Sequence, residues 1–350
     1  MSKKAVTLWT SGLAVAALAV SPAASAAGAP LPQPDGTGAG AGAGAGAGEP
    51  AEGATSSPHD RIAFVWANFE FTEEEIATVR ADGSEYTILT NEEGLDVAPE
   101  YSPDGSQIAF TSSRSMPPGF PGEPRFYSEL YLMDADGSNV RQVTFSEGVI
   151  DFQPAWSPDG RQIVIARGPG TAPPEGQLTA PTDLWIIDLP SGQELQLTDS
   201  PETWEGWPDW SPDGKRIAFE GDMAEPGNSD VYTIRTDGSD LQRLTSQASY
   251  EGDAHYSPDG RWIVFDSDRT GNVDVFVMRD DGAPVRQLTD DPGEDFAGGY
   301  SADGKFIAFS SDRDSTSGIP DIFRMRANGT QETNLTNTPD VIEFDPTWQP

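Results

Sequence analysis

Short runs of β-branched and aromatic residues recur along the chain from residue 61 onwards, and each is followed by a segment in which polar and apolar positions alternate. Arg216-Ile-Ala-Phe followed by Asp230-Val-Tyr-Thr-Ile is one such pair. Alternation with period two over a few residues predicts a β-strand with one buried face. A further short run ends in Leu-Thr, as at Leu244 and Thr245. The pattern therefore predicts an all-β region of many short strands.

One turn motif separates these strands at intervals of 55, 54, 46 and 44 residues. An aromatic residue precedes Ser-Pro-Asp-Gly at Ser102, Ser157, Ser211 and Ser257, and Ser301-Ala-Asp-Gly is a fifth copy. Ser, Pro and Gly are favoured at the first, second and fourth positions of a type I turn. Asp-Gly or Asn-Gly hairpin pairs follow within the units. Four strands in a unit of this length indicate a β-propeller blade, and we interpret the turn aspartates as structural.

The repeat is incomplete at both ends. Arg61-Ile-Ala-Phe and Glu75-Ile-Ala-Thr-Val supply a second and a third strand, but no first strand precedes them. Asp345-Pro-Thr-Trp supplies a first strand with nothing after it. Joining the two ends completes a blade and pairs an edge that would otherwise be bare. We therefore predict a six-bladed propeller of four-stranded antiparallel blades, closed by pairing of the C-terminal strand with the first blade.

The repeat resembles that of the TolB-like β-propeller family, which is WD-repeat-like. The resemblance rests on the aromatic-Ser-Pro-Asp-Gly-x-x-Ile-Ala-Phe unit with its Asp-Ile-Tyr-like and Leu-Thr strands, and it extends from Arg61 to Pro350. It implies the fold more strongly than the function, because the family is functionally diverse. TolB carries a globular domain before its propeller, and related serine peptidases carry a hydrolase domain. Neither is recognisable here, so we expect a stand-alone propeller.

The first 58 residues differ in composition from the rest. Lys3 and Lys4, an apolar run from Leu13 to Val20 and the small residues up to Ala26 predict a secretory signal peptide over residues 1–26, cleaved near Ala26. Residues 27–58 are rich in Gly, Ala and Pro, which predicts a disordered linker before a propeller over residues 59–350. We expect an exported monomer, extracellular or periplasmic. With no cysteine in the chain, disulfides are excluded.

The formal net charge is −36, from 57 acidic and 21 basic residues. A surface of this sign repels phosphate backbones, so we expect no nucleic-acid partner. No later segment is long and apolar enough for a membrane helix, so we expect no membrane insertion. Cations and basic proteins are the partners that such a surface attracts, although much of the charge is also explained by solubility or salt adaptation.

One acid recurs five residues before each first-strand aromatic residue. The six acids are Asp96, Asp151, Glu205, Glu251, Asp295 and Glu343. Because innermost strands surround the central channel of a propeller, we expect these carboxylates to form a ring at its mouth. All-oxygen ligands suit Ca²⁺, so the ring is a candidate calcium site, and no other cofactor is expected. The alternative is that each acid caps its own loop through local hydrogen bonds.

Aromatic residues lie close to these acids in the sequence. Trp204, Trp207 and Tyr250 are candidates for a platform that binds a sugar or a peptide, and we include His255 in this set. Packing is the alternative for each of them. Two long loops rich in Pro and Gly, residues 115–128 and 168–182, are expected on the same face of the propeller, where variable loops favour binding.

Recognisable catalytic motifs are missing. With His59 and His255 as the only histidines, a three-histidine metal site is excluded and a Ser-His-Asp triad is disfavoured. We interpret Ser-Asp-Arg at Arg269 and Arg313 as a repeated turn whose arginine pairs with a neighbouring carboxylate. The sequence favours a non-enzymatic scaffold that binds a protein or a cell-envelope glycan. The alternative is a glycan-acting hydrolase or lyase that uses channel carboxylates.

The calcium hypothesis predicts a specific stabilisation. A ligand that binds only the folded state stabilises it by about 2.7 kcal/mol at 100 times its Kd. Millimolar Ca²⁺ should therefore raise the Tm beyond the effect of Mg²⁺ or Na⁺ at matched ionic strength. Replacing Asp151 and Asp295 together by Asn should shrink this increment and leave the calcium-free fold intact. No excess effect of Ca²⁺, together with a destabilised double variant, would identify the acids as loop caps.

Overall fold

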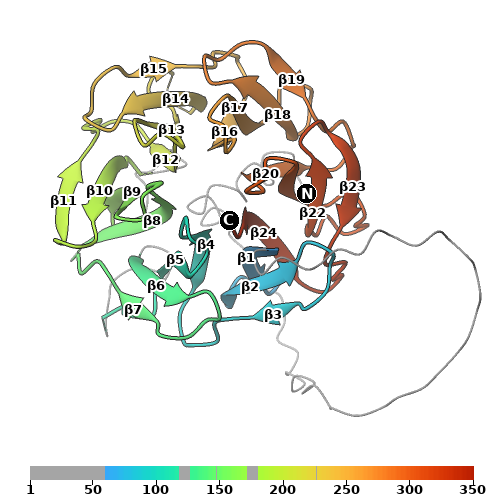
Figure 1. Ribbon diagram of the computed structural model, residues 1–350, viewed down its shortest axis with the longest axis horizontal. Coiled ribbons are helices and arrows are strands. Elements are labelled where there is room, and N and C mark those ends of the chain that lie inside the picture. The colour runs from blue at the N-terminus through green and yellow to red at the C-terminus, as the bar shows by residue number, and fades with distance from the viewer. Residues whose placement is uncertain (1–59, 118–126, 147, 172–179, 226) are drawn as a thin grey trace, which may run out of the picture.

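Six four-stranded antiparallel sheets form a closed ring in the computed structural model (Figure 1). The structure describes residues 60–117, 127–146, 148–171, 180–225 and 227–350, and it contains no helix in these ranges. The predicted signal peptide and linker lie outside the described residues, as do the central parts of the two long loops. The predicted all-β, six-bladed architecture is confirmed.

Each blade runs from an innermost strand to a strand on the rim. Blade 1 comprises β24 (Ile342–Trp348), β1 (Arg61–Ala67), β2 (Glu74–Arg80) and β3 (Thr87–Ile88). Blade 2 comprises β4 (Asp96–Tyr101), β5 (Gln107–Ser112), β6 (Glu129–Asp134) and β7 (Arg141–Gln142). Blade 3 comprises β8 (Val149–Trp156), β9 (Gln162–Pro169), β10 (Asp183–Asp188) and β11 (Gln193–Gln196).

The remaining three blades repeat this order. Blade 4 comprises β12 (Glu205–Trp210), β13 (Arg216–Gly221), β14 (Asp230–Arg235) and β15 (Gln242–Arg243). Blade 5 comprises β16 (Glu251–Tyr256), β17 (Trp262–Ser267), β18 (Asp274–Arg279) and β19 (Val285–Gln287). Blade 6 comprises β20 (Asp295–Tyr300), β21 (Phe306–Ser311), β22 (Asp321–Arg326) and β23 (Thr330–Asn334).

The Ser-Pro-Asp-Gly turns join the first strand to the second by the same hydrogen bonds in each copy. In blade 2 the Ser102 hydroxyl donates to Asp104 at 2.8 Å and accepts from the backbone N–H of Gln107 at 2.9 Å. Asp104 also accepts the backbone N–H of Ser106 at 3.0 Å. The bonds from the Ser106 and Ser102 hydroxyls and the Ser106 backbone lower the pKa of Asp104, so it stays ionised. These contacts confirm that the turn aspartates are structural.

The core lies between neighbouring blades. The second strands carry its largest fully buried side chains, among them Phe64, Phe110, Phe219, Phe265 and Phe309. These residues occupy the last position of the Ile-Ala-Phe or Ile-Val-Phe runs. Each sheet therefore depends on its neighbours to cover its apolar faces, and the six blades form one continuous structure.

Ring closure joins the two ends of the described chain in blade 1. Strand β24 pairs antiparallel with β1, with Ile62 opposite Trp348 and Ala67 opposite Ile342. Trp348 is 7% exposed and its ring lies 6.4 Å from that of Phe306 in blade 6. The predicted closure by the C-terminal strand is confirmed, and it joins blade 1 to blade 6 through side-chain packing as well as through the sheet.

Removal of residues 345–350 should therefore destabilise the whole ring. The truncation removes Trp348 and the strand partners of Ile62 and Ala63, so the first part of β1 becomes a bare edge. Loss of a buried Trp costs about 3–5 kcal/mol, or at least about 6 °C in Tm for a domain of this size. Thermal unfolding followed by circular dichroism measures the effect. Val285→Ala, which removes an exposed rim side chain, is the control and should leave the Tm unchanged. A truncated chain with an unchanged Tm would show that closure contributes nothing to stability.

Candidate functional site

The six acids of the predicted ring lie at or near the start of the innermost strands, and all are at most 1% exposed. Four of them pair with an arginine that lies near the end of the second strand of the same blade or just after it. These pairs are Asp96 with Arg114 at 2.5 Å, Asp151 with Arg167 at 2.5 and 2.8 Å, Asp295 with Arg313 at 2.6 Å, and Glu251 with Arg269. The other two bond to hydroxyls, Glu205 to Thr198 and Glu343 to Tyr86.

The paired arginines are themselves held in place. The Arg313 guanidinium lies 5.0 Å from the ring centroid of Phe309 and 5.4 Å from that of Phe323, and its Nε donates to the Ser311 hydroxyl at 2.9 Å. Arg114 and Arg269 make the same serine bond and the same kind of aromatic contact in blades 2 and 5. The predicted pairing of Arg269 and Arg313 with a neighbouring carboxylate is confirmed. We call this arrangement of acid, arginine, serine and aromatic rings in blades 2, 5 and 6 the clamp, and we call the six acids at this position of the repeat the clamp acids.

The clamps favour the local-bonding alternative for these acids. Among the described residues, no three His, Cys, Asp or Glu side chains are placed so that they could hold one metal ion. The six acids that were predicted to converge instead each bond to an arginine or a hydroxyl group close to them. Binding of Ca²⁺ to them stays a prediction, and the groups that meet at the centre of the ring are different ones.

The central channel is lined by two other positions of the innermost strands, two and four residues after each clamp acid. Five residues at the first of these positions have positive φ, between 47° and 54°, and they are Ala98, Gln153, Trp207, Asp253 and Asp345. Register shifts between the first and second strands mark a β-bulge there. In blade 6, Gly298 lies where a Cβ would meet the backbone of Pro346. Bulges re-aim side chains, and strained backbone of this kind concentrates at functional sites.

Four carboxylates and one histidine line this channel. Glu100, Asp209, Asp253 and Asp345 contribute the carboxylates, and His255 is the histidine. His255 Nε2 lies 3.0 Å from Asp253 Oδ1, and the Thr347 hydroxyl donates to Glu100 at 2.7 Å. The space open to water is about 40 Å³. That volume holds a few water molecules and is too small for a sugar ring.

Burial and mutual repulsion shift the titration of these groups. Burial lowers the pKa of His255, but the carboxylates of Asp253, Asp209 and Glu100 outweigh it and raise the pKa to about 9. Burial raises the pKa of Glu100 to about 7, against the bond from Thr347. Burial, followed by repulsion from Asp253, raises the pKa of Asp345 well above its usual range. At neutral pH the histidine is charged, and Glu100, with its pKa of about 7, is part-protonated and can release its proton to an incoming cation.

Two further acids lie behind the channel on the second strands of blades 4 and 5. Glu220 and Asp266 are at most 2% exposed. Burial raises the pKa of Glu220 to about 8, and burial and the charge of Asp253 raise the pKa of Asp266 well above its usual range. Gly252 makes room for the Glu220 carboxylate, because a Cβ at this position would overlap it. The acidic character of the channel therefore extends into the sheets.

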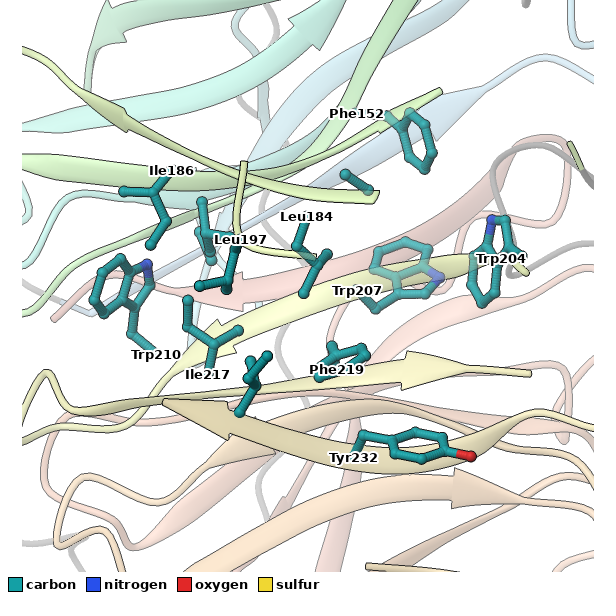
Figure 2. Close-up of a cluster of buried hydrophobic side chains, with 14 of the residues drawn as sticks. Phe152, Leu184, Ile186, Leu197, Trp204, Trp207, Trp210, Ile217, Phe219 and Tyr232 are labelled. Carbon is teal, nitrogen blue, oxygen red and sulfur yellow. The ribbon is translucent and has the colours of Figure 1, made fainter. Parts of the chain in front are cut away.

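The aromatic residues that were predicted to form one binding platform lie in different places. Trp204 is 4% and Trp207 is 9% exposed, and both indole rings lie in the apolar cluster between blades 3 and 4 (Figure 2). Trp207 also borders the channel, as does His255. Tyr250 is half-buried, and its hydroxyl donates to Glu220 at 3.2 Å. Trp204 and Tyr250 thus support the walls, while Trp207 and His255 belong to the channel itself.

Glu100, Asp209, Asp253 and Asp345 were not among the sequence candidates. A signal for them does exist, because the positions two and four residues after each clamp acid differ between blades. In blade 3 these positions hold Gln153 and Ala155, whereas in blade 5 they hold Asp253 and His255. A position that faces the axis does not pack between blades. Its residue type can therefore vary from blade to blade, whereas the packed positions of the repeat keep the same type.

The fold and the site define a six-bladed β-propeller with an acidic axial channel. The family model for the TolB beta propeller domain matches residues 53–172 and 177–350. The chain belongs to this family. Within the described residues, no helix has the length and apolar character needed to cross a membrane.

Relatives with different names match parts of the chain. The Tol-Pal system protein TolB of Anaeromyxobacter dehalogenans is 33% identical over 111 residues, which are 32% of this chain and 22% of that protein. The uncharacterized peptidase YuxL of Bacillus subtilis is 28% identical over 177 residues, 41% of this chain and 25% of that protein. The crystal structure of TolB from Acinetobacter baumannii superposes with a TM-score of 0.66 at 21% identity, covering 83% of this chain and 67% of that chain. The chain spans less than half the length of the curated relatives it matches.

Loss of one clamp arginine should strongly destabilise the fold. Asp295 is 0% and Arg313 is 9% exposed, so Arg313→Ala leaves a buried carboxylate without its partner at a cost of about 3–5 kcal/mol. Denaturation by urea measures the free energy of unfolding. Arg261→Ala breaks an exposed pair at 3.9 Å and should leave the midpoint unchanged. Equal effects of the two substitutions would contradict a structural role for the clamp.

Proposed function

We propose that this protein is a non-enzymatic binding propeller whose acidic channel receives a positively charged group of a partner protein. The observation that carries the proposal is the convergence of Glu100, Asp209, Asp253 and Asp345 on one narrow channel. A cationic side chain that enters it replaces the repulsion among these carboxylates by attraction. The formal net charge of −36 adds a long-range attraction for the same class of partner.

An unpartnered donor supports a ligand at the same place. Gln153 is 5% exposed and lines the channel. Its Oε1 accepts the backbone N–H of Trp207 at 2.8 Å, but its Nε2 has no hydrogen-bond partner among the described residues. A buried donor without a partner costs about 1–3 kcal/mol, which a ligand acceptor such as a backbone carbonyl would recover. An extended peptide offers both this carbonyl and a basic side chain.

Protein binding is also the role that agrees with the family. A Tol-Pal system protein is by name a component of an assembly, and we extend that role to this chain as a proposal. Export of the protein, with a signal peptide over residues 1–26, remains part of the same proposal.

A glycan-acting enzyme is the second candidate. It is favoured by Glu100, whose pKa of about 7 suits a general acid, and by Asp209 as a second channel carboxylate. The volume of about 40 Å³ opposes it, because a sugar ring does not fit between the two groups. Turnover of neutral oligosaccharides that is lost in Glu100→Gln would establish this candidate in place of the first.

Binding of short peptides tests the proposal. The probes are fluorescent hexapeptides of Gly and Ser that contain one Arg or Lys, with Glu-containing peptides as the counterpart. Replacing Asp209 and Asp345 together by Asn should weaken binding of the basic peptides at least about tenfold, the effect of about 1.4 kcal/mol. Replacing the exposed Glu92 and Glu93 by Gln removes the same number of acidic side chains and should leave the Kd within about twofold. If both double replacements weaken peptide binding equally, the effect comes from the overall charge of the protein and not from the channel.

The same peptides should bind more tightly as the pH rises. Glu100, with its pKa raised to about 7, is mostly protonated at about pH 6 and mostly ionised at about pH 8. A cation binds the ionised form, so binding releases protons and the affinity should increase across this window. Fluorescence anisotropy at constant ionic strength measures the change. An affinity that falls between pH 6 and pH 8 would contradict a cationic group in the channel.

A further inference from the structure

A groove on the face of the Ser-Pro-Asp-Gly turns separates blade 5 from blade 6. It has a volume of about 570 Å³, within the usual range for ligand sites, and it shares no lining residue with the channel. Trp262 of β17 and Tyr300 of β20 form its aromatic walls. Asp259, Arg286 and Asp303 add charged groups to its lining, and Val277 adds an apolar one. Trp262 is 38% exposed, whereas five other tryptophans, Trp156, Trp204, Trp207, Trp210 and Trp348, are at most 9% exposed.

The other blades show what normally occupies this place. In blade 4, Arg216 stands at the position of Trp262 and donates to the Thr233 hydroxyl and to Asp240 at 2.7 Å. Arg61 of blade 1 makes the equivalent bonds to Thr78 and Glu85. These bonds close the gap between the second strand and the rim. Blade 5 lacks all three parts of this arrangement, because the corresponding positions hold Trp262, Val277 and Pro284.

Blade 6 also has an aromatic residue at this position, but it is covered. The guanidinium groups of Arg324 and Arg326 lie 4.9 and 5.6 Å from the ring centroid of Phe306. The Trp348 ring lies on the same residue at 6.4 Å. The ring of Phe306 in blade 6 is therefore covered by other side chains, whereas the indole of Trp262 is exposed and can contact a ligand.

The charges around the groove select the class of ligand. Asp303 is paired with Lys305 at 2.8 Å and Asp259 with Arg261 at 3.9 Å, and Arg286 adds a third cation. The groove thus has no excess of negative charge, although the chain as a whole carries −36. A basic partner gains nothing here over the rest of the surface. A neutral ligand with an apolar face and many hydroxyls fits better.

We propose that this groove binds a neutral carbohydrate. The apolar face of a sugar ring stacks on the exposed indole of Trp262, and its hydroxyls bond to Asp303, Arg286 and other polar groups at the edge. The site is independent of the acidic channel. It gives the propeller a second surface, with which it can be held on a glycan while the channel engages a protein.

Titration with two neutral oligosaccharides tests this site. The probes are a hexasaccharide of glucose and a hexasaccharide of N-acetylglucosamine, followed by calorimetry and by tryptophan fluorescence on the full chain. Trp262→Gln is the test variant, because Gln107 and Gln162 occupy this position in blades 2 and 3 and the fold accepts glutamine there. We expect saturable binding of at least one probe, and at least a tenfold weaker affinity in the variant.

Two controls distinguish the groove from the rim surface and from the channel. Leu241→Gln removes an exposed apolar side chain from the neighbouring rim and should leave the affinity unchanged. The Asp209→Asn and Asp345→Asn pair should also leave it unchanged, so that failure of the channel and failure of the groove are distinguished. Absence of binding to the unmodified chain, or equal binding by Trp262→Gln, would overturn the proposal. Displacement of the sugars by a basic peptide would overturn it in favour of a protein-docking groove.

Discussion

Pairing of β24 with β1 is the constraint on which the channel depends. A propeller of six blades has an axial space only when its innermost strands surround it completely, and β24 supplies the sixth of them. This strand brings Asp345 and Thr347 into the channel, where Thr347 bonds to Glu100 across 247 positions of sequence. The stability of the ring and the composition of the site are therefore set by the same strand.

Two populations of buried acids have different physical roles. Four of the six recurring acids, Asp96, Asp151, Glu251 and Asp295, are compensated by an arginine of their own blade, whereas Glu205 and Glu343 bond to hydroxyl groups. In the part of the chain that the structure describes, His255 is the one basic side chain that lines the channel beside its acids, and the protein places the channel acids close together at an energetic cost. Uncompensated carboxylates in a narrow space favour a cationic ligand, since ligand binding recovers part of that cost. This difference in compensation is the reason why we propose a binding role for the channel.

The fold could be predicted from the sequence because the turn motif of the repeat occurs five times. Ser-Pro-Asp-Gly fixes the turn, alternation fixes the buried face, and the unmatched ends at Arg61 and Asp345 give the closure. The site could be predicted only in part. The sequence indicated the acid that recurs in each blade and the pairing of Arg269 and Arg313 with a carboxylate, but it could not show which carboxylate each arginine pairs with, or that Arg114 makes the same kind of pair. Regularity marked the structural residues, whereas the channel residues differ from one blade to the next.

The backbone conformation is a second reason why the channel residues could not be predicted from the sequence. A strict period of two places the residues two positions after each clamp acid on the same face as that acid, but the bulges at Gln153, Asp253 and Asp345 change the direction of the chain. The local sequence does not predict these left-handed backbone conformations. Likewise, the exposure of Trp262 follows from the absence of covering groups in blade 5, which becomes apparent only when the blades are compared in space.

The titration of His255 tests the central claim most directly. The chain has two histidines, so the imidazole signals of His255 can be followed by NMR across pH and assigned with a His59→Gln variant. If the carboxylates of Glu100, Asp209 and Asp253 converge on it as described, the midpoint lies near 9 and falls when Asp209 is replaced by Asn. A midpoint at or below about 6.5, the value of an unperturbed histidine, would show that no acidic channel surrounds it.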